Sequence, residues 1–416
     1  MAGQRYTIVP GGTRPTAFLP LRPVFRSEVR RVTRLLRHAD GSVELALDRG
    51  CVIAGERRSE FCEVEFECVE GGAEAVFDWA ARVLAPHPAR LLQPSKAARG
   101  FLLARGESPP PPAPRHLPIA DIPKVATSAE AIASLFDLYA PAVSENLYCV
   151  MTGSDSEGPH QLRVSLRRLR ALLALCDQAL DWKTGRRLNR QARDLGRIVS
   201  TLRDADVLVE DIARPALGGA GNASALLQTL EAHRAQTRAA TRRALCEAGA
   251  TAFALRLLEA AELRSWQPRK KKQRRRLEAP LLPTLEPVLD RAWKKVCRRG
   301  HRLARLSAEK RHRLRKDLKQ LRYLAEIANL AADAPDSRRF FRRLERLQDD
   351  LGLLNDLVTV EQRQLSADDP ATRESVASVR MQLQASPALD AQTALARAAR
   401  HWRKLHKTGP FWRSGK

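Results

Sequence analysis

Two patterns of apolar residues divide this chain. Between residues 20 and 105, apolar and polar residues alternate over short stretches, as in Val43 to Leu47 and Cys62 to Cys68. Alternation with a period of two predicts β-strands. From about Thr127 onward, long stretches rich in Ala, Leu and Arg repeat their apolar residues with a period near 3.6, which predicts amphipathic helices. A β-rich segment is therefore followed by a helical one.

Interruptions of these patterns predict the boundaries. In the β-rich part, Asp48-Arg49-Gly50 is a turn signal, Glu70-Gly71-Gly72 ends a strand, and Ala73 to Leu84 is predicted to be helical. Four consecutive prolines at 109–112 exclude a helix and predict a semi-rigid linker. We predict an α+β multidomain chain with a β-rich domain at 1–106, a linker at 107–126 and a helical domain at 127–410.

The helical part contains an internal repeat. His160-Gln-Leu-Arg-Val-Ser-Leu-Arg-Arg-Leu-Arg170 and His312-Arg-Leu-Arg-Lys-Asp-Leu-Lys-Gln-Leu-Arg322 share one pattern at an offset of 152 residues. Leu202-Arg203-Asp204 and Leu354-Asn355-Asp356 have the same offset. Two motifs at one offset indicate a duplication. We predict two helical units, at about 128–260 and 280–410, with the basic run 269–276 as an exposed loop between them.

Each motif helix has an apolar face and a basic face. At 100° per residue, the leucines of each motif fall nearly opposite its cations. Ten steps of ~1.5 Å make each cationic stripe roughly 15 Å long. The two stripes comprise His160, Arg163, Arg167 and Arg170 in the first repeat, and His312, Arg315, Lys319 and Arg322 in the second.

The next helix continues this basic pattern unequally in the two repeats. In the first repeat its basic face comprises Arg186, Arg190, Arg193 and Arg197. The equivalent positions of the second repeat are Arg338, Arg342, Glu345 and Asp349. Arg346 falls on the same face and partly compensates, so the second repeat is the less cationic one.

The charge of the chain follows the same division. The chain has 72 Lys and Arg against 47 Asp and Glu, a net charge of +25. Residues 1–110 hold 16 basic and 13 acidic residues, a net of +3, so +22 lies in 111–416. This excess is larger than solubility needs and indicates a polyanion, a membrane surface or an acidic partner. Aromatic residues make up only 5% of the chain, which favours an anion recognised through phosphate groups alone.

Other classes of protein have little support in the sequence. No apolar run approaches the roughly 18 residues that a membrane span needs, and the N-terminus does not resemble a signal peptide. The seven cysteines are scattered and form no CxxC pair, which argues against a zinc site and is typical of thiols in a reducing compartment. We therefore expect a cytoplasmic protein without a membrane partner.

His160 and His312 have two possible roles. They occupy matching positions beside arginines, so each could donate directly to a phosphate or form a structural bond to Asp204 or Asp356. Zinc ligation is disfavoured because neither helix has a second ligand at a suitable spacing. The two aspartates are expected to be caps or internal partners rather than catalytic groups.

Together these residues resemble the CHAD family, the histidine-containing α-helical domains. The resemblance covers about 127–410 and includes both motif helices, Leu202-Arg-Asp-Ala-Asp-Val207, Arg322-Tyr323 and Leu351-Gly-Leu-Leu-Asn-Asp356. It implies two pseudo-symmetric four-helix bundles whose basic helices face a shared groove that binds inorganic polyphosphate. The phosphate contacts that it implies, with two from the basic pattern of the second repeat, are His160, Arg163, Arg167, Arg170, Arg190, Arg193, Arg197, His312, Arg315, Lys319, Arg322, Arg342 and Arg346.

The front part resembles the later strands of the CYTH, or triphosphate-tunnel, family. The resemblance rests on Val43 to Gly50, on the strand with Glu63, Glu65 and Glu67, and on Ser95 to Gly100. It implies a partial antiparallel β-barrel whose three glutamates could bind a divalent ion. Members that hydrolyse triphosphates begin with an ExExK strand, and nothing in residues 1–40 matches it. We therefore expect no two-metal chemistry.

The leading hypothesis is non-catalytic binding of inorganic polyphosphate by the basic groove, a role that would target the protein to polyphosphate granules. One alternative is a metal-dependent triphosphatase or polyphosphatase in the N-terminal domain. Another is general binding of nucleic acids or other polyanions, because charge alone permits it. Even on the leading hypothesis, nucleic acid is expected as a weak competitor. No cofactor other than the divalent ion is expected.

Overall fold

The computed structural model describes residues 23–91, 94–107, 113–117, 127–180, 182–217, 223–268, 270–331, 335–366 and 391–413, and positions 373, 374, 376, 377, 379 and 381. The chain divides into two compact units, one made of 1–80 with 90–111 and the other of 81–89 with 112–416. Most of the predicted linker, at 108–112 and 118–126, lies outside the described residues. The linker boundaries therefore remain predictions.

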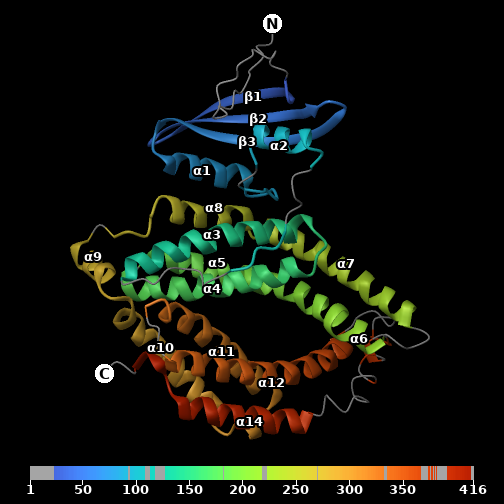
Figure 1. Cartoon of the computed structure of the whole chain (residues 1–416), viewed down its shortest axis with the longest axis vertical. Helices are drawn as coiled ribbons and strands as arrows, with labels where there is room; N and C mark the ends of the chain where they lie inside the picture. The colour runs from blue at the N-terminus through green and yellow to red at the C-terminus, as the bar shows by residue number, and fades with distance from the viewer. Residues whose placement is uncertain are drawn as a thin grey trace, which may run out of the picture. The chain divides into compact units, whose positions relative to one another are not determined.

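The first unit contains a three-stranded antiparallel sheet in the order β1-β2-β3 (Figure 1). Val52, Ala54 and Phe61 of the strands and Leu103 of α2 form a small core. Among the described residues β1 and β3 do not pair, so the sheet does not close. This open sheet is the part of the predicted partial β-barrel that the structure contains. The elements are β1 (Arg26–His38), β2 (Gly41–Ala54), β3 (Arg57–Gly71), α1 (Ala73–Leu84) and α2 (Lys96–Ala104), and α1 has the predicted bounds.

The predicted turn at Asp48-Arg49-Gly50 is wrong, because β2 continues through it. Asp48 accepts a hydrogen bond of 2.7 Å from Nε of Arg31 on β1. Gly50 allows β1 to approach closely, since a Cβ there would lie 2.0 Å from the carbonyl oxygen of Glu28. Strand pairing on both sides of β2 therefore overrides the local turn preference.

The second unit is helical and retains the 152-residue repeat. Adding 152 to the first residues of α3, α4 and α5, which are 128, 157 and 183, gives 280, 309 and 335, within one residue of the starts of α10, α11 and α12. The first-repeat helices are α3 (Ser128–Thr152), α4 (Glu157–Leu180) and α5 (Lys183–Asp206). Their equivalents are α10 (Leu281–Gly300), α11 (Ala308–Ala328) and α12 (Pro335–Ser366).

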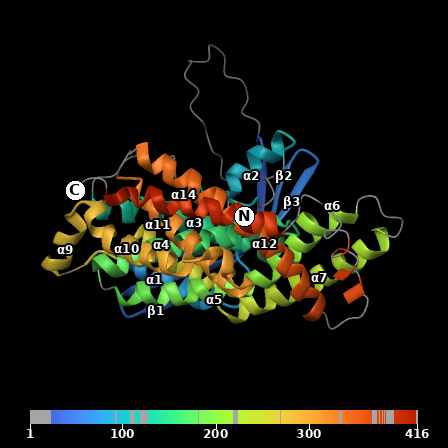
Figure 2. The same cartoon turned by 90° about the horizontal axis from the view of Figure 1, so that it is seen from below.

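Additional helices complete two bundles. In the first bundle, α5 continues into a π-helical turn (Val207–Ala213) and α6 (Arg214–Leu217). There α7 (Ala223–Glu247) packs on α5, and α8 (Ala250–Glu262) packs on α3. In the second bundle, α14 (Ala391–Thr408) lies alongside α12 in both Figure 1 and Figure 2. The predicted fold of an antiparallel sheet followed by a helical domain is confirmed.

The leucine faces of the motif helices form the centre of this core. The leucines at 162, 166, 169 and 173 of α4 and at 314, 318, 321 and 324 of α11 are each at most 1% exposed. This burial confirms the predicted apolar faces and turns the basic faces away from the bundle cores. None of the described helices has the apolar length that crossing a bilayer requires.

Contacts at the start of each repeat support the predicted pseudo-twofold symmetry. Thr127 forms an antiparallel bridge with Pro280, and the amide of Ser128 donates to the carbonyl of Ala279 at 3.1 Å. Adding 152 to 127 and 128 gives 279 and 280, so the repeat relation exchanges the partners, as a twofold axis requires. The equivalent helices α4 and α11 also contact each other.

The basic run between the repeats forms a helix, α9 (Lys271–Glu278), rather than the predicted loop. Gln273 Nε2 donates to the carbonyl oxygen of Leu180 at 2.6 Å, and Leu277 is buried. These two residues lie one helical turn apart and face inward. They hold the run in a helix while its Lys and Arg side chains remain exposed.

The described part of the predicted linker packs on the helical unit. The amide of Arg115 donates to Asn146 Oδ1 at 2.7 Å, and Arg168 Nη1 donates to the carbonyl oxygen of Leu117 at 2.7 Å. Leu117 itself is buried. Residues 113–117 are therefore held against α3 and α4.

Candidate anion-binding cleft

A basic cleft lies between the motif helices α4 and α11. It consists of two adjoining cavities, one of about 360 Å³ on the α5 side and one of about 530 Å³ on the α12 side. Both cavities are lined by Arg163, Arg167, Lys319 and Tyr323. Arg167 and Lys319 are equivalent positions of the two repeats, so the cavities meet where the repeats face each other. We refer to the two cavities together as the basic cleft.

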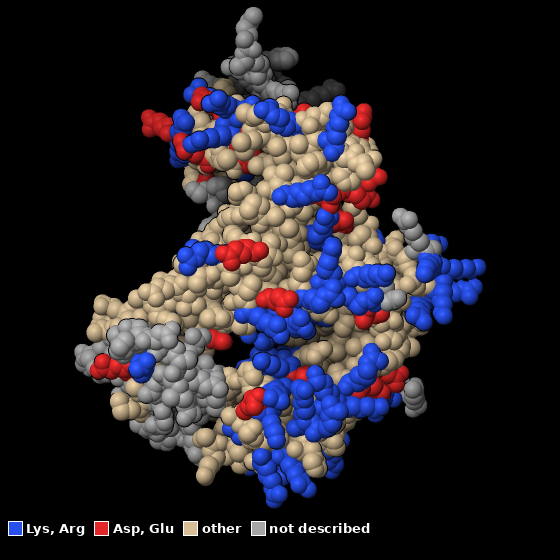
Figure 3. Space-filling model, turned by 180° about the vertical axis from the view of Figure 1, so that it is seen from behind, with Lys and Arg blue, Asp and Glu red and all other residues tan. Residues whose placement is uncertain are grey.

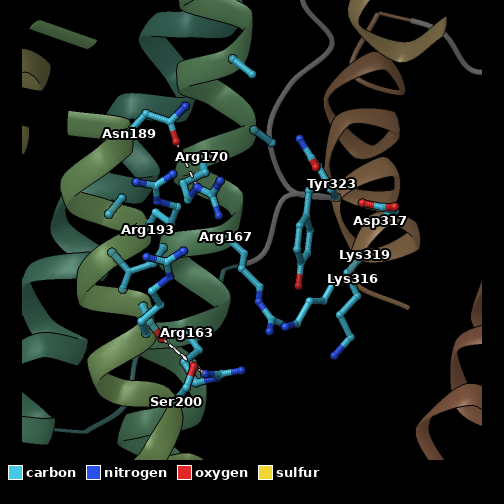
Figure 4. Close-up of a pocket in the computed structure, with 17 residues that line it drawn as sticks. Arg163, Arg167, Arg170, Asn189, Arg193, Ser200, Lys316, Asp317, Lys319 and Tyr323 are labelled. Atoms are coloured by element: carbon cyan, nitrogen blue, oxygen red, sulfur yellow. Dashed lines mark hydrogen bonds between the residues drawn. The ribbon is translucent and has the colours of Figure 1, made fainter. Parts of the chain in front are cut away.

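The α5-side cavity is strongly cationic. Figure 4 shows Arg167 from α4 and Lys316 from α11 extending into the space between the helices, whereas Asp317 points away. Asp317 is the one carboxylate among the lining residues, and it is ion-paired with Arg299 and, at 2.9 Å, with Lys295 of α10. The lining cations are Arg163, Arg167, Arg170, Arg193, Arg197, Lys316 and Lys319.

Arg163 is a part-buried cation that lines both cavities. Its Nη1 donates to the carbonyl oxygen of Gly196 at 3.4 Å and to Ser200 Oγ, as Figure 4 shows for the serine. Burial, followed by the charge of Arg167, lowers the pKa of Arg163 to about 10. The charged guanidinium is therefore destabilised in the free protein, and a multivalent anion in the cleft would remove this destabilisation.

Two further cations of this cavity are destabilised in the same way. Burial, and then the charge of Arg193, lowers the pKa of Arg170, which also donates to Asn189 Oδ1 at 3.0 Å. Burial, and then the charge of Arg167, lowers the pKa of Lys316. At ~4 Å, each pair of like charges costs on the order of 1 kcal/mol even at high dielectric. Folding therefore brings these cations close together in the cavity and destabilises their charged forms.

The α12-side cavity has a mixed charge. Arg322 Nε donates to Glu326 at 3.1 Å, and its Nη1 donates to Gln348 at 3.3 Å. Burial, and then the charge of Glu345, raises the pKa of Asp349, which also lines the cavity. This side of the cleft is therefore the less cationic one, in the direction that the comparison of repeats predicts.

The two histidines have different surroundings despite their equivalent positions. His312 Nδ1 is hydrogen-bonded to Asn355 Oδ1, and the charge of Arg203, the repeat equivalent of Asn355, acts on His160. Burial lowers the pKa of both imidazoles. Within the described contacts neither histidine bonds to Asp204, and the side chain of Asp356 lies outside the described part. The observed structural partner of His312 is thus an amide.

The cleft brings together most, but not all, of the predicted contacts. Arg190, Arg342 and Arg346 are exposed and do not line it, and His312, which is hydrogen-bonded to the lining residue Asn355, does not line it either. The predicted residues that line it are His160, Arg163, Arg167, Arg170, Arg193, Arg197, Arg315, Lys319 and Arg322.

Several residues that line the cleft were absent from the predicted contacts, among them Arg168 and the three discussed next. Lys316, Arg203 and Tyr323 correspond to Val164, Asn355 and Ala171 of the other repeat. A search for features shared by the two repeats passes over positions at which the repeats differ. The available signals were the positive charge of Lys316 and Arg203, the place of Lys316 and Tyr323 on a motif helix, and the place of Arg203 in the repeated segment Leu202-Arg203-Asp204.

The predicted metal ligands lie in the first unit. Glu63 and Glu65 come together with Asp48, whereas Glu67 is outside this group of described carboxylates. The ammonium of Lys96 lies 2.6, 2.5 and 2.7 Å from Asp48, Glu63 and Glu65. This geometry does not fit a divalent ion, because a cation already contacts all three carboxylates.

The comparisons with known proteins agree with this architecture. The CHAD domain model matches residues 135–365, which is 231 of 416 residues. The crystal structure of the CHAD domain from the plant Ricinus communis has a TM-score of 0.56 and 24% identity, and the match covers 71% of this chain and 96% of that one. An inorganic triphosphatase of Haemophilus influenzae is 33% identical over 83 residues, which are 20% of this chain and 24% of that enzyme. By the extent of the family match, this chain belongs to the CHAD domain family.

Proposed function

We propose that this chain is a non-catalytic binding protein for inorganic polyphosphate, held in the basic cleft between α4 and α11. The observation that carries the proposal is the α5-side cavity, where seven cations surround a space whose one lining carboxylate is already paired. The CHAD family match and the partial similarity to an inorganic triphosphatase support a function related to polyphosphate. A targeting role at polyphosphate granules is part of the proposal.

The chemistry of the cleft favours an anion without bases. Tyr323 is the one aromatic residue among the residues that line the two cavities. The guanidinium of Arg168 lies over its ring, 5.8 Å from the centroid. Recognition of single-stranded nucleic acid relies on aromatic rings on which successive bases stack. A linear chain of phosphates needs only the cations that the cleft provides.

The proposal includes no hydrolysis. Phosphoryl transfer depends on divalent ions that neutralise the charge developing on the phosphate oxygens. The carboxylates expected to hold such an ion are engaged by Lys96, and Glu63 is also engaged by Arg99 at 2.8 Å. These ion pairs favour a structural role for the carboxylates of Asp48, Glu63 and Glu65.

The test is a competition between labelled long-chain polyphosphate, single-stranded RNA and duplex DNA at matched phosphate concentration. It is performed at near-physiological salt and over a magnesium series, with binding and phosphate release followed together. We expect polyphosphate to bind at least about tenfold more tightly than either nucleic acid, with no release. Equal and salt-sensitive affinities would indicate a general polyanion surface. Magnesium-dependent release that Glu65→Gln abolishes would establish the enzymatic alternative.

Affinity is expected to increase as the pH falls through about 6.5, the ordinary histidine pKa. Burial and adjacent cations favour neutral His160 in the free protein, and burial favours neutral His312. A bound polyanion stabilises the imidazolium, so binding takes up protons and strengthens at lower pH. The charged groups that act on the two rings are Arg203, Glu157, Lys319 and Arg163 at His160, and Lys316, Arg315 and Asp204 at His312.

The stability of the ligand-free protein should change in the opposite direction. A lowered histidine pKa means that below about 6.5 the unfolded chain binds more protons than the folded one. The free energy of unfolding should therefore decrease as the pH is lowered. Titration calorimetry and thermal unfolding across this range measure both effects. The variant His160→Gln with His312→Gln controls for titration of the ligand itself, and an unchanged pH dependence in that variant would refute the linkage.

A further inference from the structure

We propose that the anion-binding surface continues beyond the basic cleft along α5 and onto α9, so that long polyphosphate chains bind the helical domain outside the cleft as well. This inference rests on the proposed function of the cleft. It assigns a binding role to the basic run that forms α9, which the cleft itself does not use.

The first step is the exposed basic face of α5. Arg193 and Arg197 line the α5-side cavity and are also exposed, so the cavity is open to solvent along this helix. Lys183 precedes Arg197 by 14 positions, which span roughly 21 Å of helix. No acidic residue occurs between Lys183 and Arg190, and Asp194 is the one carboxylate of this stretch, ion-paired at 3.4 Å with both Arg193 and Arg197. A cationic face therefore leads from the cleft to the beginning of α5.

The second step is the position of α9 at that end of α5. Leu180, the last residue of α4, precedes the first residue of α5 by three positions. Gln273 of α9 donates to the carbonyl oxygen of Leu180 at 2.6 Å, and α9 packs on both α3 and α4. The fold therefore places α9 where the exposed face of α5 begins.

The third step is the charge of α9. Within Lys271–Glu278 there are five cations and one carboxylate, and all five cationic side chains are exposed. In the part of the chain that the structure describes, none of them has an ion-pair partner. Lys271, Arg274 and Arg275 line a small cavity of about 280 Å³ together with Glu278. Like charges three and four residues apart repel each other along a helix, and a bound polyanion would remove this repulsion.

The surface charge agrees with these steps. Figure 3 shows Lys and Arg side chains gathered along the boundary between the two bundles and again at the edge of the helical domain where α9 lies. The occupant that fits a cationic surface of this length is a chain of phosphates longer than the cleft. Tripolyphosphate, which the cleft can hold alone, should not reach α9.

The experiment compares two triple variants of the full chain with the unmutated protein. The α9 variant is Lys271→Ala with Arg274→Ala and Arg275→Ala. The control removes the same charge from exposed positions of α14 that do not line the cleft, Arg400→Ala with Arg403→Ala and Lys407→Ala. Affinities for long-chain polyphosphate and for tripolyphosphate are measured over a salt series.

We expect the α9 variant to bind long-chain polyphosphate about tenfold more weakly than the control, with unchanged affinity for tripolyphosphate. The salt dependence of long-chain binding should also become less steep, because fewer counterions are released. A charge-preserving variant, Lys271→Arg with Arg274→Lys and Arg275→Lys, should retain the affinity of the unmutated protein.

The outcomes separate this inference from the function on which it rests. Equal long-chain affinities of the α9 and α14 variants would overturn the extension onto α9 while leaving binding in the cleft intact. Weak binding of polyphosphate by the unmutated protein would overturn the proposed function and the extension together. A loss by the α9 variant that is equally large for tripolyphosphate would show that α9 supports the cleft instead of extending it.

Discussion

The double variant Arg163→Ala with Arg315→Ala is expected to bind polyphosphate at least about 100-fold more weakly than the unmutated protein. The two arginines are equivalent positions of the repeats, and each faces the basic cleft. A hydrogen bond to a charged group contributes ~1.5–3 kcal/mol, so losing two such contacts removes ~3–6 kcal/mol of binding free energy. The effect should appear mainly in the dissociation rate.

Both bundles should remain folded in this variant. The two arginines lie opposite the buried leucine faces, and Arg163 is already destabilised as a cation, with a pKa of about 10. Removing its charge should therefore not lower the thermal unfolding midpoint. Circular dichroism checks the fold, and Arg400→Ala with Arg403→Ala is the matched control for net charge. Unchanged affinity in a folded double variant would exclude the cleft as the binding site.

Lys96→Ala is expected to destabilise the N-terminal sheet by ~3–5 kcal/mol, the usual effect of removing one partner from a buried ionic group. The side chain of Asp48 is fully buried, and Lys96 Nζ lies 2.6 Å from its carboxylate. Glu63 and Glu65 also contact this ammonium. Without it, three carboxylates would repel one another at the centre of the sheet, and of the cations that contact them in the described part of the chain Arg31 and Arg99 would remain.

Hydrogen exchange of residues 41–54 measures this effect locally, so overlapping unfolding of the helical domain does not interfere. Arg105→Ala, which removes an exposed cation from the same unit, is the control. Unchanged exchange of β2 in Lys96→Ala would contradict the structural role of the cluster. Manganese-dependent protection in Lys96→Ala, absent from the unmutated protein, would show that the ammonium takes the place of a divalent ion.

The same cluster has a defined acid dependence. The hydrogen bond from Arg31 is the largest factor that holds the pKa of Asp48 at about 2. A depressed carboxyl pKa stabilises the fold above the unfolded value of about 3.9, and this stabilisation, about 2 kcal/mol, is lost as the pH falls toward 2. In Lys96→Ala the loss should begin at higher pH, because one of the cations that favours the carboxylate is gone.

Features carried by short-range periodicity could be predicted from the sequence. The leucine faces of α4 and α11 follow from spacings of three and four residues, which the helix itself places on one side. The duplication follows from a constant offset that both motifs share. These two observations determine which face of each motif helix is buried and that the domain has two equivalent halves.

Features that depend on residues distant in sequence required the tertiary structure. Asp48 was predicted to be in a turn, but it lies in a strand where Arg31 and Lys96 pair with it. The basic run at 269–276 was predicted to be a loop, but most of it forms α9, because Leu180 and the core hold one face of that helix. Lys316 joins the cleft only because α11 packs against α4. The sequence alone determined the two basic helices and their burial, since helical periodicity is local. Which cations share one cavity was decided only by packing, because electrostatic crowding depends on distances between residues that the chain brings together from far apart.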